Sequence, residues 1–402
     1  MTTVLGVFRN ELGRVFALRP VASVMVIAAA VYALFYPQPY LNEALRKVPI
    51  AVVDQDRSQT SRELARLIDA TPDVAVAEVA PDMPTAQREV YTRSIFGILL
   101  IPQHFERDLL HGRASPIALY ADASYFLMYQ RMNGAVTAVS RTMGTNFEVS
   151  RLVGLGVDLP VAEAATDPMP FIPVPLFNPQ GGYATYILPA AFVLILQQTL
   201  LIGVGLLGTL PGAIVGPAGA ARRRFSDMAL ESIVIVAGKL LAYLTVESLI
   251  VSTYLIGLPY LYGIPRLGSV TTILAFALPF TLAVGALGLL VAAVLRKPLA
   301  VQLVFAAIGL PFFFLAGFAW PVEAMPTAVK WLAKLLPSTL AIDGLVDVAQ
   351  LGASLSDVRS EFLGLWLLVA AYAGIAVIVE FNKRRLAAYP GSDQPVRAQE
   401  VL

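Results

Sequence analysis

Long apolar stretches separated by polar segments dominate the pattern of this chain. A helix needs about 20 mainly apolar residues to cross the roughly 30 Å hydrocarbon core of a bilayer, and it must satisfy its own backbone hydrogen bonds there. Stretches that reach or approach this length lie at 20–36, 183–208, 232–258, 270–295, 299–319 and 361–381. The pattern therefore predicts an α-helical polytopic membrane protein with six transmembrane helices, followed by a polar tail at 382–402.

Residues 1–19 precede the first span and show helical periodicity. Apolar residues recur at Val4, Leu5, Phe8, Leu12, Val15 and Phe16, whereas Arg9, Asn10, Glu11 and Arg14 fall on the other face. This spacing predicts an amphipathic helix that lies along the cytoplasmic membrane surface. The same residues fit a positively charged leader of the first span or a cleaved signal peptide, and the pattern leaves these alternatives open.

Residues 37–182, between the first two spans, have the pattern of a separate α/β domain. The short runs PIAVVD, VAVAEV, IFGILLIP and PIALY are rich in branched residues, and segments with helical spacing separate them. This alternation predicts a sheet whose strands are at least partly parallel. In the segment TSRELARLIDA, Thr60 and Glu63 are spaced as a capping box at the start of a helix.

Two further segments complete this domain. Apolar residues at three- and four-residue steps predict a long helix over about 123–154; they are Met128, Met132, Val136, Val139, Met143 and Phe147. Its methionine stripe packs against the sheet or a second subunit, or forms an adaptable binding surface. The proline-rich DPMPFIPVPLFNP, residues 167–179, predicts a stiff connection to the second span.

Residues 320–360, after the fifth span (the last of the helices within 183–319), are too interrupted to cross the membrane. Pro321, Pro326 and Pro337 divide this segment, and the piece TAVKWLAKLL is amphipathic. We expect a surface helix or a shallow re-entrant hairpin on the outer side.

Composition agrees with lipid as the main solvent. Hydrophobic residues make up 57% of the 402 residues and charged residues only 14%, about half the fraction usual in soluble domains. The net charge of +1 offers no basic footprint for a nucleic acid. Cysteine is absent, and His104 and His111 have no further ligands beside them, so no metal site is predicted.

Basic residues indicate the orientation. One side of the six-span arrangement collects Arg9, Arg14, Arg19, Arg222, Arg223, Arg224, Arg296, Lys297, Lys383, Arg384 and Arg385. Basic loops face the cytoplasm, so both termini are predicted to be cytoplasmic and the α/β domain extracytoplasmic. The triple arginine between the second and third spans serves topology alone or, with Asp227 and Glu231, contacts a cytoplasmic partner.

Several segments along nearly the whole chain carry a family resemblance. They are the surface helix before the first span, VPIAVVDQDRSQTSREL, FNPQGGYATYILPA, Gly238-Lys239 and, most specifically, GFAWPVEAMP followed by LLPSTLAIDGL. With these segments the chain resembles the permease subunit of ATP-binding-cassette exporters of the second type (ABC-2 family), in the subgroup with a large periplasmic domain after the first helix. Between the second and third spans that family often has an acidic-Arg-Gly-Thr run, and RRRFSDMALE stands there instead.

The resemblance implies an assembly and a function. It implies a multi-pass permease of the bacterial inner membrane that exports an amphipathic small molecule, drug or lipid-like substrate from the cytoplasm or inner leaflet. The implied partners are two cytoplasmic ABC ATPase subunits, a second permease in a homo- or heterodimer, a periplasmic adaptor protein and membrane lipid. The implied ATPase contacts are Arg14, Arg222, Arg223, Arg224, Asp227 and Glu231. No Gly-x4-Gly-Lys-Ser/Thr loop occurs in the chain, so no cofactor is expected in it, and ATP and magnesium are expected on the partner ATPase.

Polar residues inside the predicted spans are candidates for the substrate path, because ionisable groups there are costly. Lys239, in the third span, is near enough to the cytoplasmic end to snorkel. Glu247, deeper in that span, either pairs with another helix or meets substrate. Gln197 and Gln198, in the second span, either hydrogen-bond across helices or contact substrate.

Two other functions stay open at this point. An ion-gradient-driven secondary exporter would use Glu247 as a proton site, although the chain shows no internal inverted repeat. A membrane-anchored assembly or sensor protein would act through the outer domain. An enzyme is disfavoured, since no cluster of nucleophile, base and metal ligands occurs near the spans.

Overall fold

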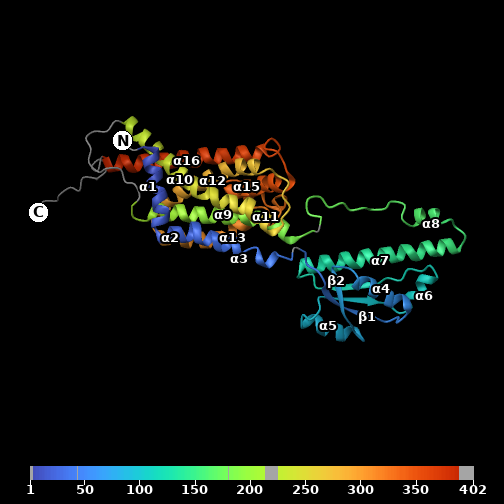
Figure 1. Ribbon diagram of the computed structural model, residues 1–402. Coiled ribbons are helices and arrows are strands. Elements are labelled where there is room, and N and C mark those ends of the chain that lie inside the picture. Colours follow the sequence, from blue (N-terminus) through green and yellow to red (C-terminus); the bar gives the residue numbers. More distant parts are fainter. Residues whose placement is uncertain (1–2, 43, 180, 213–224, 389–402) are drawn as a thin grey trace. The chain divides into compact units, whose positions relative to one another are not determined.

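A computed structural model describes residues 3–42, 44–179, 181–212 and 225–388 of the chain (Figure 1). The loop arginines Arg222, Arg223 and Arg224 lie outside the described residues. The chain divides into two compact units, one formed by Met1–Leu41 with Tyr183–Leu402 and the other by Asn42–Gly182. We call them the helical unit and the sheet unit.

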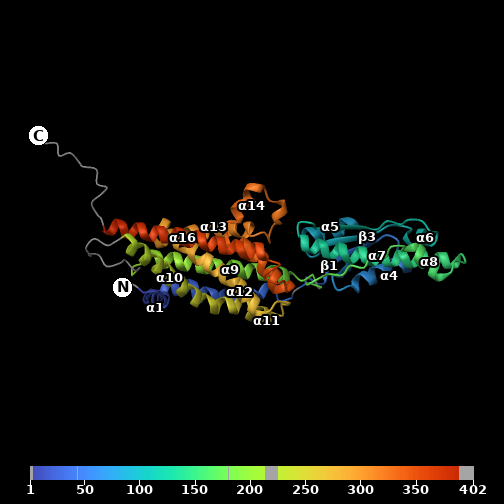
Figure 2. The ribbon, with the colours of Figure 1, turned by 90° about the horizontal axis from the view of Figure 1, so that it is seen from above.

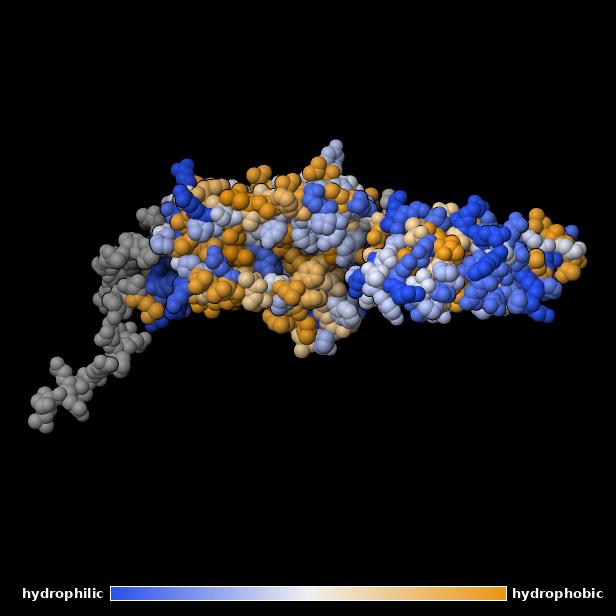
Figure 3. All heavy atoms as spheres, turned by 90° about the horizontal axis from the view of Figure 1, so that it is seen from below, coloured by the Kyte–Doolittle hydropathy of each residue, from blue (hydrophilic) through white to orange (hydrophobic). Residues whose placement is uncertain are grey.

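The helical unit is a bundle of long apolar helices. Six helices among the described residues are long and apolar enough to cross a membrane: Arg19–Tyr40, Tyr183–Thr209, Phe225–Tyr262, Val270–Leu295, Pro298–Leu315 and Arg359–Leu386. The prediction of six transmembrane helices is confirmed. The surface of this unit seen in Figure 3 is largely hydrophobic, as expected for side chains that face lipid.

The elements of the helical unit follow the chain in this order. They are α1 (Val4–Ala17), α2 (Arg19–Ala22), η1 (Ser23–Ala28), α3 (Ala29–Phe35), η2 (Gln38–Tyr40), α9 (Tyr183–Thr209), α10 (Phe225–Ser252), η3 (Thr253–Gly257), α11 (Leu258–Tyr262), α12 (Val270–Leu295), α13 (Pro298–Leu315), η4 (Val322–Ala324), α14 (Thr327–Ala333), α15 (Pro337–Val346), η5 (Asp347–Leu351) and α16 (Arg359–Ala388). The segments η1, η3 and η5 are π-helical, and such local widening of a helix is frequent near functional sites.

Helix α9 forms the centre of the bundle. Most of its side chains are buried, and it packs against α12, α13 and α15. A helix that is apolar on all sides is suited to such a position. By contrast, α13 and α16 bury few of their own residues, which leaves apolar faces free to meet lipid or another protein.

The segment between α13 and α16 contains one exposed and one buried helix. Helix α14 stands apart from the packed spans (Figure 2), and its Trp331 is exposed. Helix α15 packs against α9, α12 and α16 with Ala341, Ile342 and Leu345 buried. The prolines therefore divide this segment into two pieces with different environments.

The sheet unit is an α/β fold with a mixed four-stranded sheet. Its elements are β1 (Val48–Asp54), α4 (Gln59–Asp69), β2 (Val74–Val79), α5 (Met83–Tyr91), β3 (Gly97–Ile101), α6 (Phe105–Leu110), β4 (Ala118–Ala121), α7 (Phe126–Gly154) and α8 (Leu159–Thr166). The strand order is β2-β1-β3-β4, where β1 is parallel to both β2 and β3, and β4 is antiparallel to β3. The predicted α/β class with partly parallel strands is confirmed.

The two faces of the sheet are covered unequally. Ile50 and Val52 of β1 face α4, α6 and α7 across the larger core, which includes Met132 of α7. Ala51 and Val53 face α5 in a smaller core. Since α5 has only 9 residues, it covers only part of its face of the sheet.

The predicted capping box of α4 is wrong. Helix α4 begins after Ser58, whose hydroxyl accepts a hydrogen bond from the Ser61 N–H at 3.0 Å. Thr60 instead donates its hydroxyl to Glu106 of α6 at 2.6 Å, and Glu63 pairs with Arg66. A serine two residues earlier offers an equally good cap, so the helix extends back to it.

Candidate functional site

Helix α1 buries a face that contains both polar and apolar side chains, namely Val7, Glu11, Arg14 and Val15. The sequence pattern places Glu11 and Arg14 on the polar side of an amphipathic helix, yet both are buried, whereas Leu5 and Phe16 are exposed. The exposed apolar side chains of α1 could contact the acyl chains of a bilayer, as those of an amphipathic surface helix do. Glu11 and Arg14 therefore serve contacts within the protein, whereas Arg9 and Asn10 of the polar side stay exposed.

Glu11, Arg14 and Tyr243 form a buried hydrogen-bonded cluster, which we call the Glu11 network. Arg14 Nη1 donates to Glu11 Oε2 at 2.8 Å, and the Tyr243 hydroxyl donates to Glu11 Oε1 at 2.6 Å. Arg14 Nη2 also donates to the carbonyl oxygen of Leu207 at 2.7 Å. The network therefore joins α1 to α10 and to the end of α9.

The position of Arg14 at the end of α9 is electrostatically favourable. The last carbonyls of a helix have no partner within the helix and carry its negative partial charge. Besides Leu207, the carbonyls of Leu210 and Pro211 lie 3.4 Å from Arg14 Nη2. One guanidinium thus neutralises the buried Glu11 and caps α9.

Helices α1 and α10 pack closely at Gly238. A Cβ atom at this position would lie 2.7 Å from Val7 Cβ and 2.9 Å from the carbonyl oxygen of Val4. Contacts under about 3.0 Å force the neighbours to move, and here one of them is backbone. The packing of α1 on α10 therefore requires glycine at 238.

A second ion cluster joins the ends of α10 and α16. Arg384 Nη1 pairs with Glu231 at 2.7 Å and Arg384 Nε with Glu380 at 3.2 Å. Glu231 thus contributes to contacts inside the unit. Asp227, one turn earlier in α10, is exposed and is therefore available to a partner.

Lys239 and Glu247 are both buried on α10. Among the described residues, neither carboxylate oxygen of Glu247 has a hydrogen-bond partner. An ionised carboxylate in apolar surroundings is costly without such compensation. Glu247 is therefore a candidate functional group, because packing alone does not account for it.

Gln197 anchors α15 to α9. Its Oε1 accepts a hydrogen bond from the backbone N–H of Ser338 at 2.8 Å. Ser338 lies in the first turn of α15, where backbone N–H groups have no partner within the helix. Gln198 is only half-buried and lies beside Gly309 of α13. The neighbouring glutamines therefore face different helices.

Gln197→Ala is expected to lower the free energy of unfolding by about 1–3 kcal/mol, because the Ser338 N–H is left buried and unpartnered. Gln198→Ala is the matched control, since it removes the same atoms from the same helix without breaking a hydrogen bond of this kind. Thermal unfolding of the purified protein in detergent measures both. Equal losses for the two variants would refute this role of Gln197.

Sequence reasoning identified Arg14 and Gln197 but missed their partners. Glu11 and Arg14 are three residues apart, the spacing of an ion pair within a helix. This spacing could have predicted Glu11 as the partner of Arg14. Tyr243 and Ser338 carried no such signal, since they lie 232 and 141 residues from Glu11 and Gln197 respectively.

Two comparisons with known proteins bear on this arrangement. Residues 21–378 match the profile of the family described as ABC-2 family transporter protein. The chain is 23% identical over 392 residues to the linearmycin resistance permease protein LnrN of Bacillus subtilis (strain 168). The aligned region covers 93% of this chain and 97% of that protein.

Proposed function

Because this chain belongs to the ABC-2 family of transporter proteins, we propose that it is the membrane permease of an exporter driven by ATP hydrolysis on separate ATPase subunits. Its similarity to a permease named for resistance to linearmycin supports export. The substrate that we propose is an amphipathic small molecule, a drug or a lipid-like compound. The six apolar spans make the chain a membrane protein.

The proposed assembly places this permease in the bacterial inner membrane with both termini in the cytoplasm. Two permeases, identical or related, pair with two ABC ATPases, and the sheet unit faces the periplasm, where an adaptor protein binds. The arginine-rich loop of Arg222, Arg223 and Arg224 forms the ATPase contact together with Asp227 and Glu231. The distribution of basic residues supports this orientation.

The observation that carries the proposed mechanism is the connection of α1 to two spans through the Glu11 network. Arg14 bonds the end of α9, and Tyr243 bonds Glu11 from α10. When ATP draws the ATPases together, a displacement of α1 is passed to both spans, because breaking either bond would remove a hydrogen bond from a buried charged group. Since Arg14 is buried, it supports the ATPase contact from beneath by positioning α1.

The test is efflux in proteoliposomes that contain the permease and its cognate ATPase. We expect efflux of an amphipathic fluorescent drug that requires magnesium and ATP and survives collapse of the ion gradients. Efflux that follows the proton gradient without ATP would favour the secondary exporter. An absence of efflux under both conditions, with the complex intact, would favour the assembly or sensor function.

Glu247→Leu is expected to raise the melting temperature and to lower ATP-driven efflux. The substitution stabilises the fold because it removes a buried carboxyl that has no hydrogen-bond partner among the described residues. It lowers efflux because it removes this acidic group from the proposed substrate path. Differential scanning fluorimetry and the efflux assay measure the two effects. Glu247→Gln retains the shape and serves as control for packing. Unchanged efflux in Glu247→Leu would exclude Glu247 from transport.

A further inference from the structure

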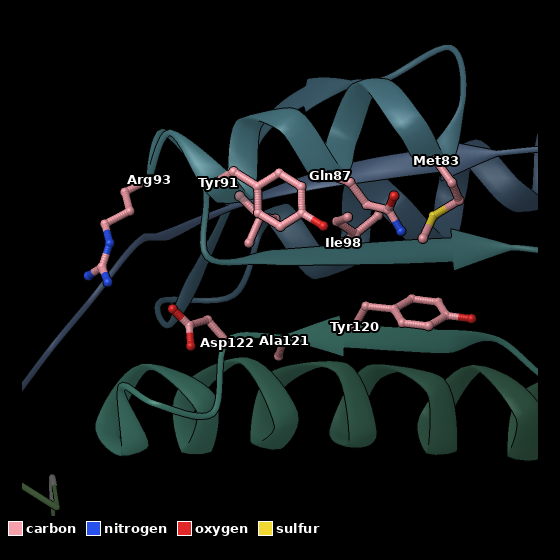
Figure 4. A pocket seen from close by; sticks show the side chains of 9 residues that line it. Met83, Gln87, Tyr91, Arg93, Ile98, Tyr120, Ala121 and Asp122 are labelled. Atoms are coloured by element: carbon pink, nitrogen blue, oxygen red, sulfur yellow. The ribbon is translucent and has the colours of Figure 1, made fainter.

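A groove crosses the α5 face of the sheet unit between α5 and β4 (Figure 4). Its volume is about 430 Å³, and it is lined by Met83, Gln87, Val90, Tyr91, Arg93, Ile98, Tyr120, Ala121 and Asp122. Tyr91 of α5 and Tyr120 of β4 are 80% and 52% exposed. Two exposed tyrosines beside an apolar floor are typical of a protein-binding surface.

The polar end of the groove is already ordered. The Arg93 guanidinium lies over the Tyr125 ring, 4.8 Å from its centroid, and also donates to the Tyr125 hydroxyl. Asp122 accepts hydrogen bonds from the hydroxyl and the backbone N–H of Ser124, which lower the pKa of Asp122. The groove therefore combines an aromatic centre with fixed polar groups.

The proline-rich segment of the same unit, residues 167–179, exposes apolar side chains to solvent. It could therefore fill a groove such as the one between α5 and β4. Five of the segment's large apolar side chains are between 70% and 83% exposed, and Phe177 is 44% exposed; the five are Met169, Phe171, Ile172, Val174 and Leu176. Prolines at 168, 170, 173, 175 and 179 favour a polyproline II conformation. With three residues per turn, Pro170 and Pro173 lie on the same face of such a helix.

Hydrocarbon is a poor environment for this segment. A polyproline II backbone makes no internal hydrogen bonds, so its carbonyl groups would be unpaired in the bilayer core. Grooves lined by aromatic side chains with nearby hydrogen-bond donors are the known way in which proteins bind such segments. The α5 groove offers Tyr91 and Tyr120 with the donors Gln87 and Arg93.

Both ends of the segment are tied to α7. Arg141 pairs with Asp167 at 3.3 Å, and Arg131 donates to the carbonyl oxygen of Gly181 at 2.9 Å. The two arginines are about 15 Å apart along the helix, whereas residues 167–176 alone would span about 28 Å as polyproline II. The chain then turns at Phe177 and Asn178. The segment is therefore longer than the distance that it bridges, so it can stand away from α7 and be accessible to another molecule.

Helix α7 and the groove lie on opposite faces of the sheet. Met132 and Met143 of α7 belong to the larger core, whereas Ile98 and Val90 of the groove belong to the smaller core on the α5 side. To enter its own groove, the segment would have to wrap around the sheet edge. A second copy can present its groove directly.

We propose that residues 168–175 of one permease dock in the α5–β4 groove of a second copy of this chain. A symmetric pair then exchanges two identical contacts, which closes the dimer. This inference rests on the proposed permease dimer and deepens it by naming a surface through which the two sheet units recognise each other.

The absence of cysteine from the chain permits a direct test by disulfide trapping. Two differently tagged copies are expressed together, one with Gln87→Cys on the groove rim and the other with Val174→Cys in the segment, and membranes are oxidised. We expect about tenfold more covalent dimer carrying both tags than with Gln59→Cys in place of Gln87→Cys, because docking raises the local concentration of the thiols. Gln59 is a matched control, since it is also an exposed helical glutamine but lies on α4, on the other face of the sheet.

Equal trapping at Gln59→Cys, or the absence of a covalent dimer carrying both tags, would overturn the proposal. A third variant carries Gln87→Cys and Val174→Cys in one chain. A disulfide that forms mainly within that chain would overturn the proposal as well. A fluorophore at Val174→Cys that is quenched by brominated lipid would place the segment in the bilayer and also overturn it. Tyr91→Ala with Tyr120→Ala should abolish the excess of trapped dimer. ATP-driven efflux by the parent protein is measured in parallel, so efflux without trapping rejects only the docking, and trapping without efflux rejects only the proposed transport.

Discussion

Arg14→Met is expected to lower the free energy of unfolding by about 3–5 kcal/mol, the usual cost of leaving one charge of a buried ion pair uncompensated. Glu11 is fully buried, and Arg14 is its ion-pair partner at 2.8 Å. The Tyr243 hydroxyl remains as a donor, but it is neutral and cannot balance the carboxylate. Thermal unfolding in detergent measures the loss. We expect ATP-driven efflux to fall as well, since α1 loses its bond to α9.

Arg9→Met is the matched control for this prediction. Arg9 lies on the same helix, carries the same charge and is exposed, so its replacement removes a cation without leaving a buried partner. The double variant Glu11→Gln with Arg14→Met should recover part of the stability, because no buried charge then remains. If Arg14→Met were no less stable than Arg9→Met, the Glu11 network would not hold α1 in place.

Gly238→Ala is expected to destabilise the protein by about 1–3 kcal/mol and to uncouple α1 from α10. The added Cβ would meet Val7 Cβ and the carbonyl oxygen of Val4 at less than 3.0 Å, and the Val4 backbone can move only if α1 shifts. Melting temperature and efflux report stability and coupling. Co-purification of the ATPase, measured alongside, separates a failure to bind the ATPase from a failure to respond to it.

Gly13→Ala provides the comparison within α1. A Cβ at Gly13 has no atom within 4 Å, so the substitution should be neutral or should stabilise the helix by about 0.5–1 kcal/mol. The two glycine substitutions are chemically identical and differ only in what surrounds the new methyl group. A Gly238→Ala variant that behaves like Gly13→Ala would contradict close packing of α1 on α10.

Together these variants examine one physical property of the helical unit. Surface ion pairs contribute little to stability, but a buried pair that also bonds helix-end carbonyls resists separation strongly. The Glu11 network and Gly238 therefore give α1 a firm attachment to α9 and α10 by two different means, polar contacts and close backbone approach.

The sequence by itself determined the six spans and the α/β class of the sheet unit, and it supported the family resemblance. These features depend on local properties: the length of an apolar run compared with the thickness of a bilayer, and the alternation of short branched strands with helical segments. Such patterns persist whatever the arrangement of the elements in space. The family match over 21–378 agrees with what these local patterns indicated.

Only the tertiary structure decided which side of α1 is buried and which groups meet Glu11 and Gln197. In a membrane protein, apolar side chains are favourable toward lipid as well as toward the core, so hydropathy alone does not say which face of a helix packs against protein. The partners Tyr243 and Ser338 lie 232 and 141 residues away along the chain, and their pairing depends on distances in space that no local pattern contains. The cap of α4 was likewise decided between two nearby residues, Ser58 and Thr60. The Ser58 hydroxyl accepts a hydrogen bond from the Ser61 N–H, whereas Thr60 donates both its N–H and its hydroxyl to Glu106 of α6.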